Sequence, residues 1–152
     1  MPEVAIDRLV EVLVEALEQM AFIMLCPLEE PAESPADPVL ARVQFDGPVR
    51  GHVDLLTGKQ LGIAMAANML ASSIDDPQVV AQANDTLREL LNVTCGAMLN
   101  EWMSQLGGTF QMQIPSVTVI SKEQWQQLMN TSDFMALDAE GQVIAIRLVK
   151  SE

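Results

Sequence analysis

Apolar residues recur every three or four positions in three parts of the chain, with polar residues on the other side of the helical wheel. This period predicts helices over Ala5–Leu25, Gly58–Ala71 and about Gln78–Leu106. An Asp-Pro pair precedes the longest of them and a Gly-Gly pair follows it, as is typical of helix starts and ends. We therefore expect three amphipathic helices, the last of them long.

Other segments have the β-branched and alternating residues that are typical of strands. Two pairs flank turn sequences and predict hairpins, and a third pair lies on either side of Pro115. The six segments are Val39–Phe45 with Val49–Leu56, Phe134–Asp138 with Gln142–Val149, and Thr109–Ile114 with Val117–Ile120. Lys122–Ser132 has no clear period, and the sequence predicts neither helix nor strand there.

The order of these elements predicts the fold class. The 152 residues are enough for one domain with its own core, spanning residues 1–152. Cys26–Pro38 is rich in proline and acidic residues, which predicts a surface loop rather than a linker between domains. We expect an α+β fold of two loosely repeated halves, with long helices packed on a largely antiparallel sheet.

The charge of the chain narrows the possible partners. It carries 8 Lys and Arg against 21 Asp and Glu, a formal net charge of −13. Such a surface repels phosphate backbones and anionic lipids, so we expect no nucleic-acid binding and no membrane binding. No apolar run approaches the length of a membrane span, and Met1–Ile6 lacks the features of an export signal. The sequence therefore predicts a cytoplasmic protein.

Residues that commonly hold metals or act as nucleophiles are sparse. Cys26 and Cys95 lie far apart in apolar surroundings, which predicts two buried free thiols in a reducing compartment. The single histidine, His52, has no nearby partners for a zinc site or a Ser-His-Asp triad. We therefore expect no metal or cofactor of the chain's own.

One face of the long predicted helix carries an unusual set of residues. They are spaced by four, three, four and four, which places them on one side: Asp85, Glu89, Asn92, Gly96 and Asn100. A solvated helix side is one interpretation. Solvated sides are usually rich in Lys and Glu, however, whereas Asn and Gly form helices poorly. The face is therefore also a candidate for binding or catalysis.

This spacing resembles the signature of the CheC, CheX and FliY chemotaxis phosphatase family. Asp85, Glu89 and Asn92 stand at the three helix positions of that signature, and Pro115 stands at its proline. The resemblance continues through the helix sequence NVTCGAMLN, the hairpin VQFDGPVRGHVDLL and the first-helix segment EALEQMAFIML. It covers most of the chain.

The resemblance implies a protein phosphatase that hydrolyses the aspartyl phosphate of a CheY-like receiver domain. In this interpretation Asn92 orders the attacking water, and Glu89 bonds to the lysine beside the receiver's phosphorylation site. Gly96 and Asn100 would contact the partner. Asp85 would do the same, brace the start of the helix, or be an ordinary helix residue. Mg²⁺ would belong to the receiver, and Pro115 would set the path of the following strand.

The first predicted helix carries an incomplete copy of the same motif. Asp7 and Glu11 have the spacing of the acidic pair, but Val14 stands where the motif needs an amide. The resemblance therefore implies a CheX-like protein with a single site, and Asp7 and Glu11 are expected to face solvent. CheX-like chains also suggest a homodimer.

Two other functions stay open. One is a non-catalytic domain that binds a receiver, or another signalling or motility partner, and sequesters or scaffolds it. The other is a small-molecule enzyme that uses acidic residues, although no close pair of carboxylates suggests a reaction. The sequence identifies neither the receiver nor whether the pathway is chemotaxis or another two-component circuit.

Overall fold

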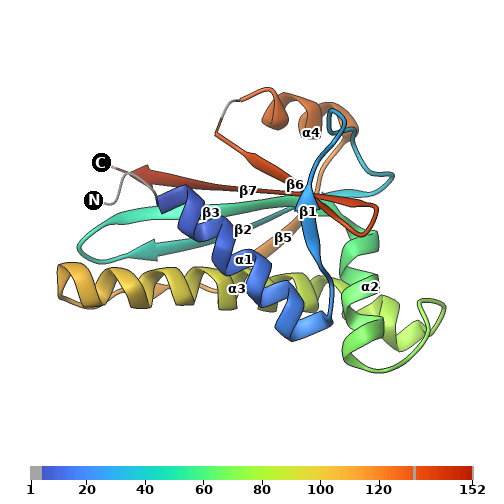
Figure 1. The fold of residues 1–152 in the computed structure, drawn as a ribbon, viewed down its shortest axis with the longest axis horizontal. Helices are drawn as coiled ribbons and strands as arrows, with labels where there is room; N and C mark the ends of the chain where they lie inside the picture. Colours follow the sequence, from blue (N-terminus) through green and yellow to red (C-terminus); the bar gives the residue numbers. More distant parts are fainter. Residues whose placement is uncertain (1–4, 132, 152) are drawn as a thin grey trace.

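Four helices cover the two faces of one antiparallel sheet in the computed structural model, which describes residues 5–131 and 133–151 (Figure 1). The helices are α1 (Ala5–Ala21), α2 (Lys59–Met69), α3 (Pro77–Leu106) and α4 (Lys122–Met129). The strands are β1 (Leu25–Pro27), β2 (Pro38–Asp46), β3 (Arg50–Gly58), β4 (Gln111–Met112), β5 (Ser116–Val119), β6 (Met135–Ala139) and β7 (Gln142–Ser151). The predicted α+β class is confirmed.

The two predicted hairpins form the centre of the sheet. β2 pairs antiparallel with β3, and β6 pairs antiparallel with β7. The hairpins meet where β3 and β7 run side by side. The strand order across the whole sheet is β1-β6-β7-β3-β2-β4, and β5 also pairs with β2. The short strands β1, β4 and β5 therefore flank the two hairpins. Each half of the sheet therefore consists of one hairpin and short outer strands.

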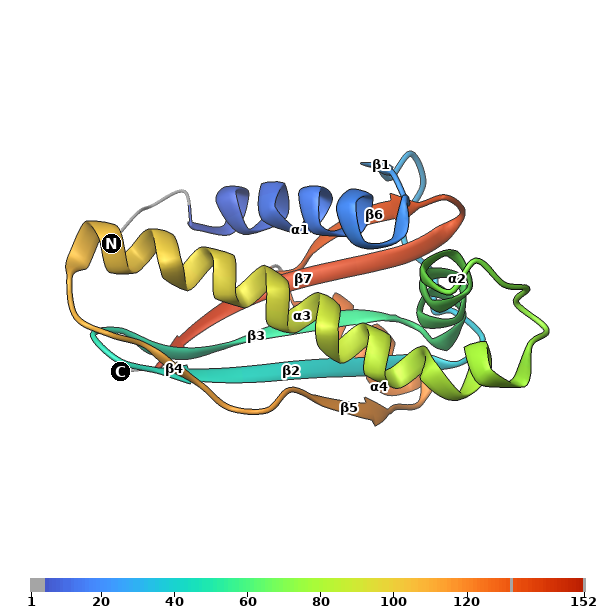
Figure 2. The same ribbon diagram turned by 90° about the horizontal axis from the view of Figure 1, so that it is seen from below.

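Two hydrophobic cores lie on opposite faces of the sheet. The larger one lies under α1, α2 and α3 (Figure 2). In it, the rings of Phe45 and Trp102 have centroids 5.8 Å apart, and Phe110 packs beside both. α4 covers the other face, where Trp125 packs with Leu56 and Ala145. The two long helices, α1 and α3, thus share one face of the sheet.

α3 starts and ends at the residues that the sequence predicts. The side chain of Asp76 caps its first turn by accepting a hydrogen bond from the Gln78 amide at 2.9 Å, and Pro77 follows the cap. Hydrogen bonds from the Ser72 hydroxyl and this amide hold the pKa of Asp76 below its usual value. Gly107, with φ +73, ends the helix. The result is a 30-residue helix that runs the length of the sheet (Figure 2).

The first helix is shorter than predicted. α1 ends at Ala21 instead of Leu25, because Phe22 adopts a left-handed backbone conformation with φ +57. The following segment forms β1, which pairs with β6. The Pro-rich surface loop therefore begins after β1, later than the predicted start at Cys26.

The prediction of two buried thiols is wrong for Cys26 and right for Cys95. Cys26 lies on β1, which forms one edge of the sheet, and its side chain is exposed. Cys95 lies on the inner side of α3, and burial raises the pKa of its thiol to about 12. The thiol of Cys95 is therefore protonated at neutral pH and inert.

The segment without a predicted structure contains α4. A capping box opens this helix: the Ser121 hydroxyl accepts from the Gln124 amide at 3.0 Å, and the Gln124 side chain accepts from the Ser121 amide at 2.9 Å. Ser132, the last residue of that segment, and Met1–Val4 lie outside the described residues. Within the described ranges, no helix combines the length and apolar character needed to cross a membrane.

Candidate functional site

α3 presents its predicted polar face to solvent. Its apolar residues face the sheet and the neighbouring helices, which fixes the rotation of the helix. The buried set is Val79, Ala83, Thr86, Leu87, Leu90, Leu91, Thr94, Cys95, Met98, Leu99 and Trp102. Of the five candidates, Asp85, Glu89 and Asn100 are exposed, and Asn92 and Gly96 are half-buried. The structure therefore brings all five to one accessible side of the helix.

Glu89 and Asn92 lie close together on this face and have free polar atoms. They are three residues apart, so their side chains leave the helix on adjacent turns. Within residues 5–131 and 133–151, neither side chain forms a hydrogen bond or an ion pair. A carboxylate and a carboxamide that are accessible and unengaged can both bind groups of a partner.

Asp85 is tied to its own helix. Its carboxylate accepts a hydrogen bond from the Arg88 guanidinium at 2.6 Å, with 69% of its side chain exposed. An exposed pair of this kind contributes less than about 1 kcal/mol to folding. The start of the helix is capped by Asp76, nine positions earlier, so Asp85 does not brace it. Contact with a partner and an ordinary helix-surface residue paired with Arg88 both fit this geometry.

Gly96 is not required by the packing of the protein. A Cβ atom placed on it would meet only the terminal methyl of Met112, at 3.9 Å, an ordinary van der Waals contact. The glycine therefore keeps the helix surface low without an internal reason. Asn100 lies a turn further on, where its side chain is exposed and its carbonyl accepts from the Ser104 hydroxyl at 3.3 Å.

Pro115 is not part of α3. It is buried, and it stands between β4 and β5, the two short strands that pair with β2. A proline has no amide hydrogen to donate, so this is a position where the strand tolerates a missing ladder bond. Its position fits a role in the course of the chain rather than in chemistry.

The incomplete motif of α1 is engaged in ion pairs. The Arg8 guanidinium donates to Glu11 at 2.8 Å and to Glu101 of α3 at 2.6 Å. These hydrogen bonds raise the pKa of Arg8, and Arg8 lowers the pKa of Glu101. Asp7 is exposed and Val14 is half-buried. Glu11 is therefore solvent-facing, as predicted, but unlike Glu89 it is paired.

A buried charge cluster that the sequence analysis missed lies on the opposite face of the sheet. Asp54 of β3 is completely buried and accepts hydrogen bonds from Arg42 at 2.6 and 2.9 Å and from Arg147 at 2.8 Å. The Nε2 atom of His52 lies 3.5 Å from the same carboxylate. These residues come from β2, β3 and β7, so they link the two hairpins and belong to the fold.

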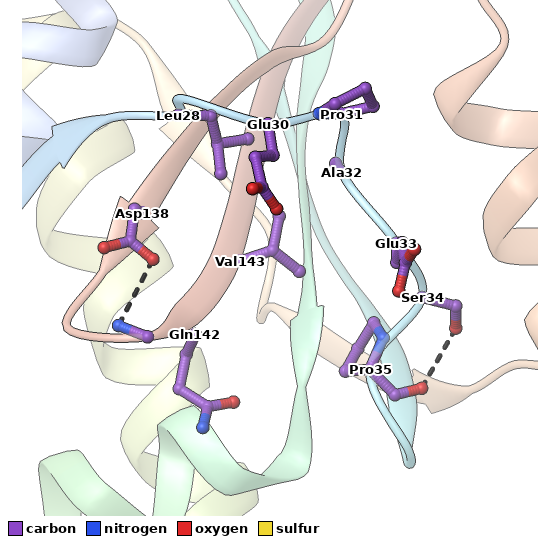
Figure 3. A pocket seen from close by; sticks show the side chains of 11 residues that line it. Leu28, Glu30, Pro31, Ala32, Glu33, Ser34, Pro35, Asp138, Gln142 and Val143 are labelled. Carbon is purple, nitrogen blue, oxygen red and sulfur yellow. Dashed lines mark hydrogen bonds between the residues drawn. The ribbon is translucent and has the colours of Figure 1, made fainter.

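A groove of about 700 Å³ lies between the Pro-rich loop and the β6–β7 hairpin (Figure 3). The carboxylates of Glu30, Glu33 and Asp138 line it together with the apolar side chains of Leu28 and Val143. α3 contributes no residue to this groove. In the part of the chain that the structure describes, no three His, Cys, Asp or Glu residues are placed to hold a metal ion.

The comparisons with known proteins identify similar chains. The family model described as "Chemotaxis phosphatase CheX" matches residues 39–136, which include all five candidates and Pro115. A comparison with curated proteins found no match.

Solved structures of similar fold cover almost the whole chain. A CheX–CheY complex with BeF3 and Mg²⁺ from Borrelia burgdorferi has a TM-score of 0.71 and 17% identity, over 97% of this chain and 98% of that one. A CheC-like protein from Shewanella sp. PV-4 has a TM-score of 0.68 and 21% identity, over 100% of both chains. FliY from Thermotoga maritima has a TM-score of 0.60 and 14% identity, over 99% of this chain and 92% of that one.

Proposed function

The chain belongs to the CheX chemotaxis phosphatase family, and on this premise we propose that it hydrolyses the aspartyl phosphate of a CheY-like receiver domain. The strongest support is the pair formed by Glu89 and Asn92, which are accessible on one face of α3 and have no side-chain partner among the described residues. The similar fold of a CheX solved in complex with CheY supports a receiver as the partner. Such a substrate also agrees with the predicted cytoplasmic location.

Asn92 would position the water that attacks phosphorus. An acyl phosphate is already reactive, and its transfer passes through a loose transition state, so placing water in line is a large part of the catalysis. The side-chain carbonyl of Asn92 can accept a hydrogen bond from this water while a lone pair points at phosphorus. The new P–O bond forms as the bond to the aspartyl carboxylate breaks, and the water's proton remains on the released phosphate.

Glu89 would hold the two proteins in register. Its free carboxylate can form a charge-assisted bond with a lysine beside the phosphorylated aspartate, and such bonds are shorter and stronger than neutral ones. Mg²⁺ would sit on the receiver, as the BeF3 and Mg²⁺ of the CheX–CheY complex suggest. The homodimer that the sequence suggests stays a prediction beside this mechanism.

Loss of phosphate from a phosphorylated receiver tests these roles. We expect Asn92→Ala to lower kcat by about 10²–10³-fold, as removal of a positioned polar group typically does. Glu89→Ala should mainly raise KM. Glu11→Ala removes the matching carboxylate of the incomplete motif on α1 and should change neither constant. Equal rates for all four proteins would refute the proposal.

The same assay separates catalysis from binding alone. A non-catalytic receiver-binding domain would associate with the phosphorylated receiver in calorimetry without accelerating hydrolysis. Asn92→Ala would then leave both association and phosphate release unchanged. The unpaired amide of Asn92 next to Glu89 favours catalysis over this alternative.

A further inference from the structure

The edge of the sheet beside α3 contains a β-bulge. β4 pairs with β2 in the register Met112 to Phe45, whereas β5 pairs with β2 in the register Val117 to Ala41. Five positions on the edge therefore face four positions on β2, so the edge carries one extra residue. The bulge lies in the segment that contains Ile114 and Pro115. Bulges re-aim side chains and are frequent beside functional sites.

The bulge and the strand after it expose two large apolar side chains. Ile114 is 90% exposed, and Val119, at the end of β5, is 77% exposed. Val119 pairs with the buried Val39, so it points to the face of the sheet that carries α3. Among the described residues β5 pairs only with β2, and no element covers these two side chains.

This apolar edge lies next to the polar face of α3. β5 and α3 run side by side with Cα atoms within 8 Å, and Figure 2 shows β5 beneath the middle of the helix. Met112, just before the bulge, reaches to within 3.9 Å of the Cβ position at Gly96. Val93, 39% exposed, adds an apolar side chain on the helix itself.

We propose that Ile114 and Val119 form an apolar docking edge that the phosphorylated receiver covers when α3 enters its active site. This inference rests on the proposed function and extends it from the catalytic pair to substrate recognition. A folded partner that covers Glu89 and Asn92 extends beyond one helix turn, and the nearest surface on this side is the β5 edge. The partner surface would carry apolar side chains at the rim of its phosphorylation site, because Ile114 and Val119 offer no polar side-chain atom.

The double variant Ile114→Ser, Val119→Ser tests the docking edge. Both side chains are exposed, so the protein should fold with an unchanged melting temperature. We expect KM for the phosphorylated receiver to rise about tenfold, the effect of losing part of the burial energy of two aliphatic groups, while kcat stays unchanged. Ile74→Ser, which removes a 57% exposed isoleucine from the α2–α3 connection, is the matched control and should have no effect.

The outcomes separate the docking edge from the proposed function. If Asn92→Ala lowers kcat as expected but the double variant leaves KM unchanged, the docking edge is refuted and the phosphatase stands. If the double variant lowers kcat alone, the edge acts on the chemistry and docking is again refuted. If it only converts a dimer to a monomer in sedimentation, the edge serves a second copy of the chain instead. If Asn92→Ala has no effect, both proposals fall.

Discussion

At the scale of single residues, the buried charge cluster of the sheet makes the stability of the fold depend on pH through His52. Burial is the main cause that lowers the pKa of His52, and the nearby Arg42 and Arg147 lower it further, while Asp54 opposes them. Its Nε2 atom is buried and has no hydrogen-bond partner in the described structure. A proton on His52 is therefore less favourable in the folded state than in the unfolded chain.

The sign of the pH dependence follows from this difference. An unfolded histidine binds its proton near pH 6.5, and the folded one binds it at lower pH, so acidification favours the unfolded state in between. We expect the free energy of unfolding in urea to fall as the pH is lowered from 7.5 to 5.5. His52 is the single histidine, and histidine is the side chain whose ordinary pKa lies between pH 5 and 8, so His52→Gln should remove this slope. An unchanged slope in the variant would contradict the assignment.

The sequence predicts which charged side chains pair only where a short turn joins the two strands that carry them. A hairpin that closes between Asp46 and Arg50 places Arg42 opposite Asp54. The Arg42–Asp54 pair could therefore have been predicted from the sequence. Arg147 could not be predicted, because its place depends on how two hairpins far apart in the chain pair. The same holds for the ion pair between Arg8 and Glu101.

At the scale of elements, Gly96 sets helix stability against partner contact in α3. Glycine inside a helix costs about 0.5–1 kcal/mol relative to alanine, and the Cβ position at Gly96 is open. Gly96→Ala should therefore raise the free energy of unfolding in urea by about that amount. Gly62→Ala is the contrasting variant: its Cβ would lie 2.7 Å from the Ala83 carbonyl oxygen, so it should destabilise the protein.

Gly96→Ala is expected to weaken binding of the receiver although it stabilises the fold. If a receiver backbone approaches α3 at Gly96, the added methyl group should raise KM while the protein becomes more stable. A stabilised variant with an unchanged KM would show that Gly96 does not contact the receiver. Stability and KM together thus separate a structural glycine from one needed for docking.

The elements that the sequence predicts best are those with strong local signals. α3 has a long apolar stripe, a capping Asp-Pro pair and a terminal glycine, so its polar face follows from spacing alone. β1 has three residues and pairs with a strand more than a hundred residues away, so no local pattern marks it. In α4 only Trp125 is buried, which leaves no apolar period, although the Ser121 and Gln124 capping box was a usable signal. The bulge between β4 and β5 depends on how these strands pair with β2, so no local pattern predicts it either.

At the scale of the whole molecule, one sheet joins two cores. On β3, Leu55 belongs to the core under the long helices, and its neighbour Leu56 belongs to the core under α4. β7 alternates in the same way, with Ala145 on the α4 side between two residues of the larger core. Loss of packing on one face therefore loosens the strands that hold the other face. We expect residues 1–152 to unfold as a single domain.

The two tryptophans of the chain make this expectation measurable, because one lies in each core. Trp102→Phe leaves Trp125 to report the core under α4, and Trp125→Phe leaves Trp102 to report the core under the long helices. In each variant, the melting temperature from tryptophan fluorescence should equal that from far-ultraviolet circular dichroism, since a two-state transition gives coincident curves. A fluorescence transition of Trp125 that precedes the loss of secondary structure would show that the α4 layer unfolds separately. The α3 face would then stay ordered while the other face of the sheet is open, and the single-domain prediction would be wrong.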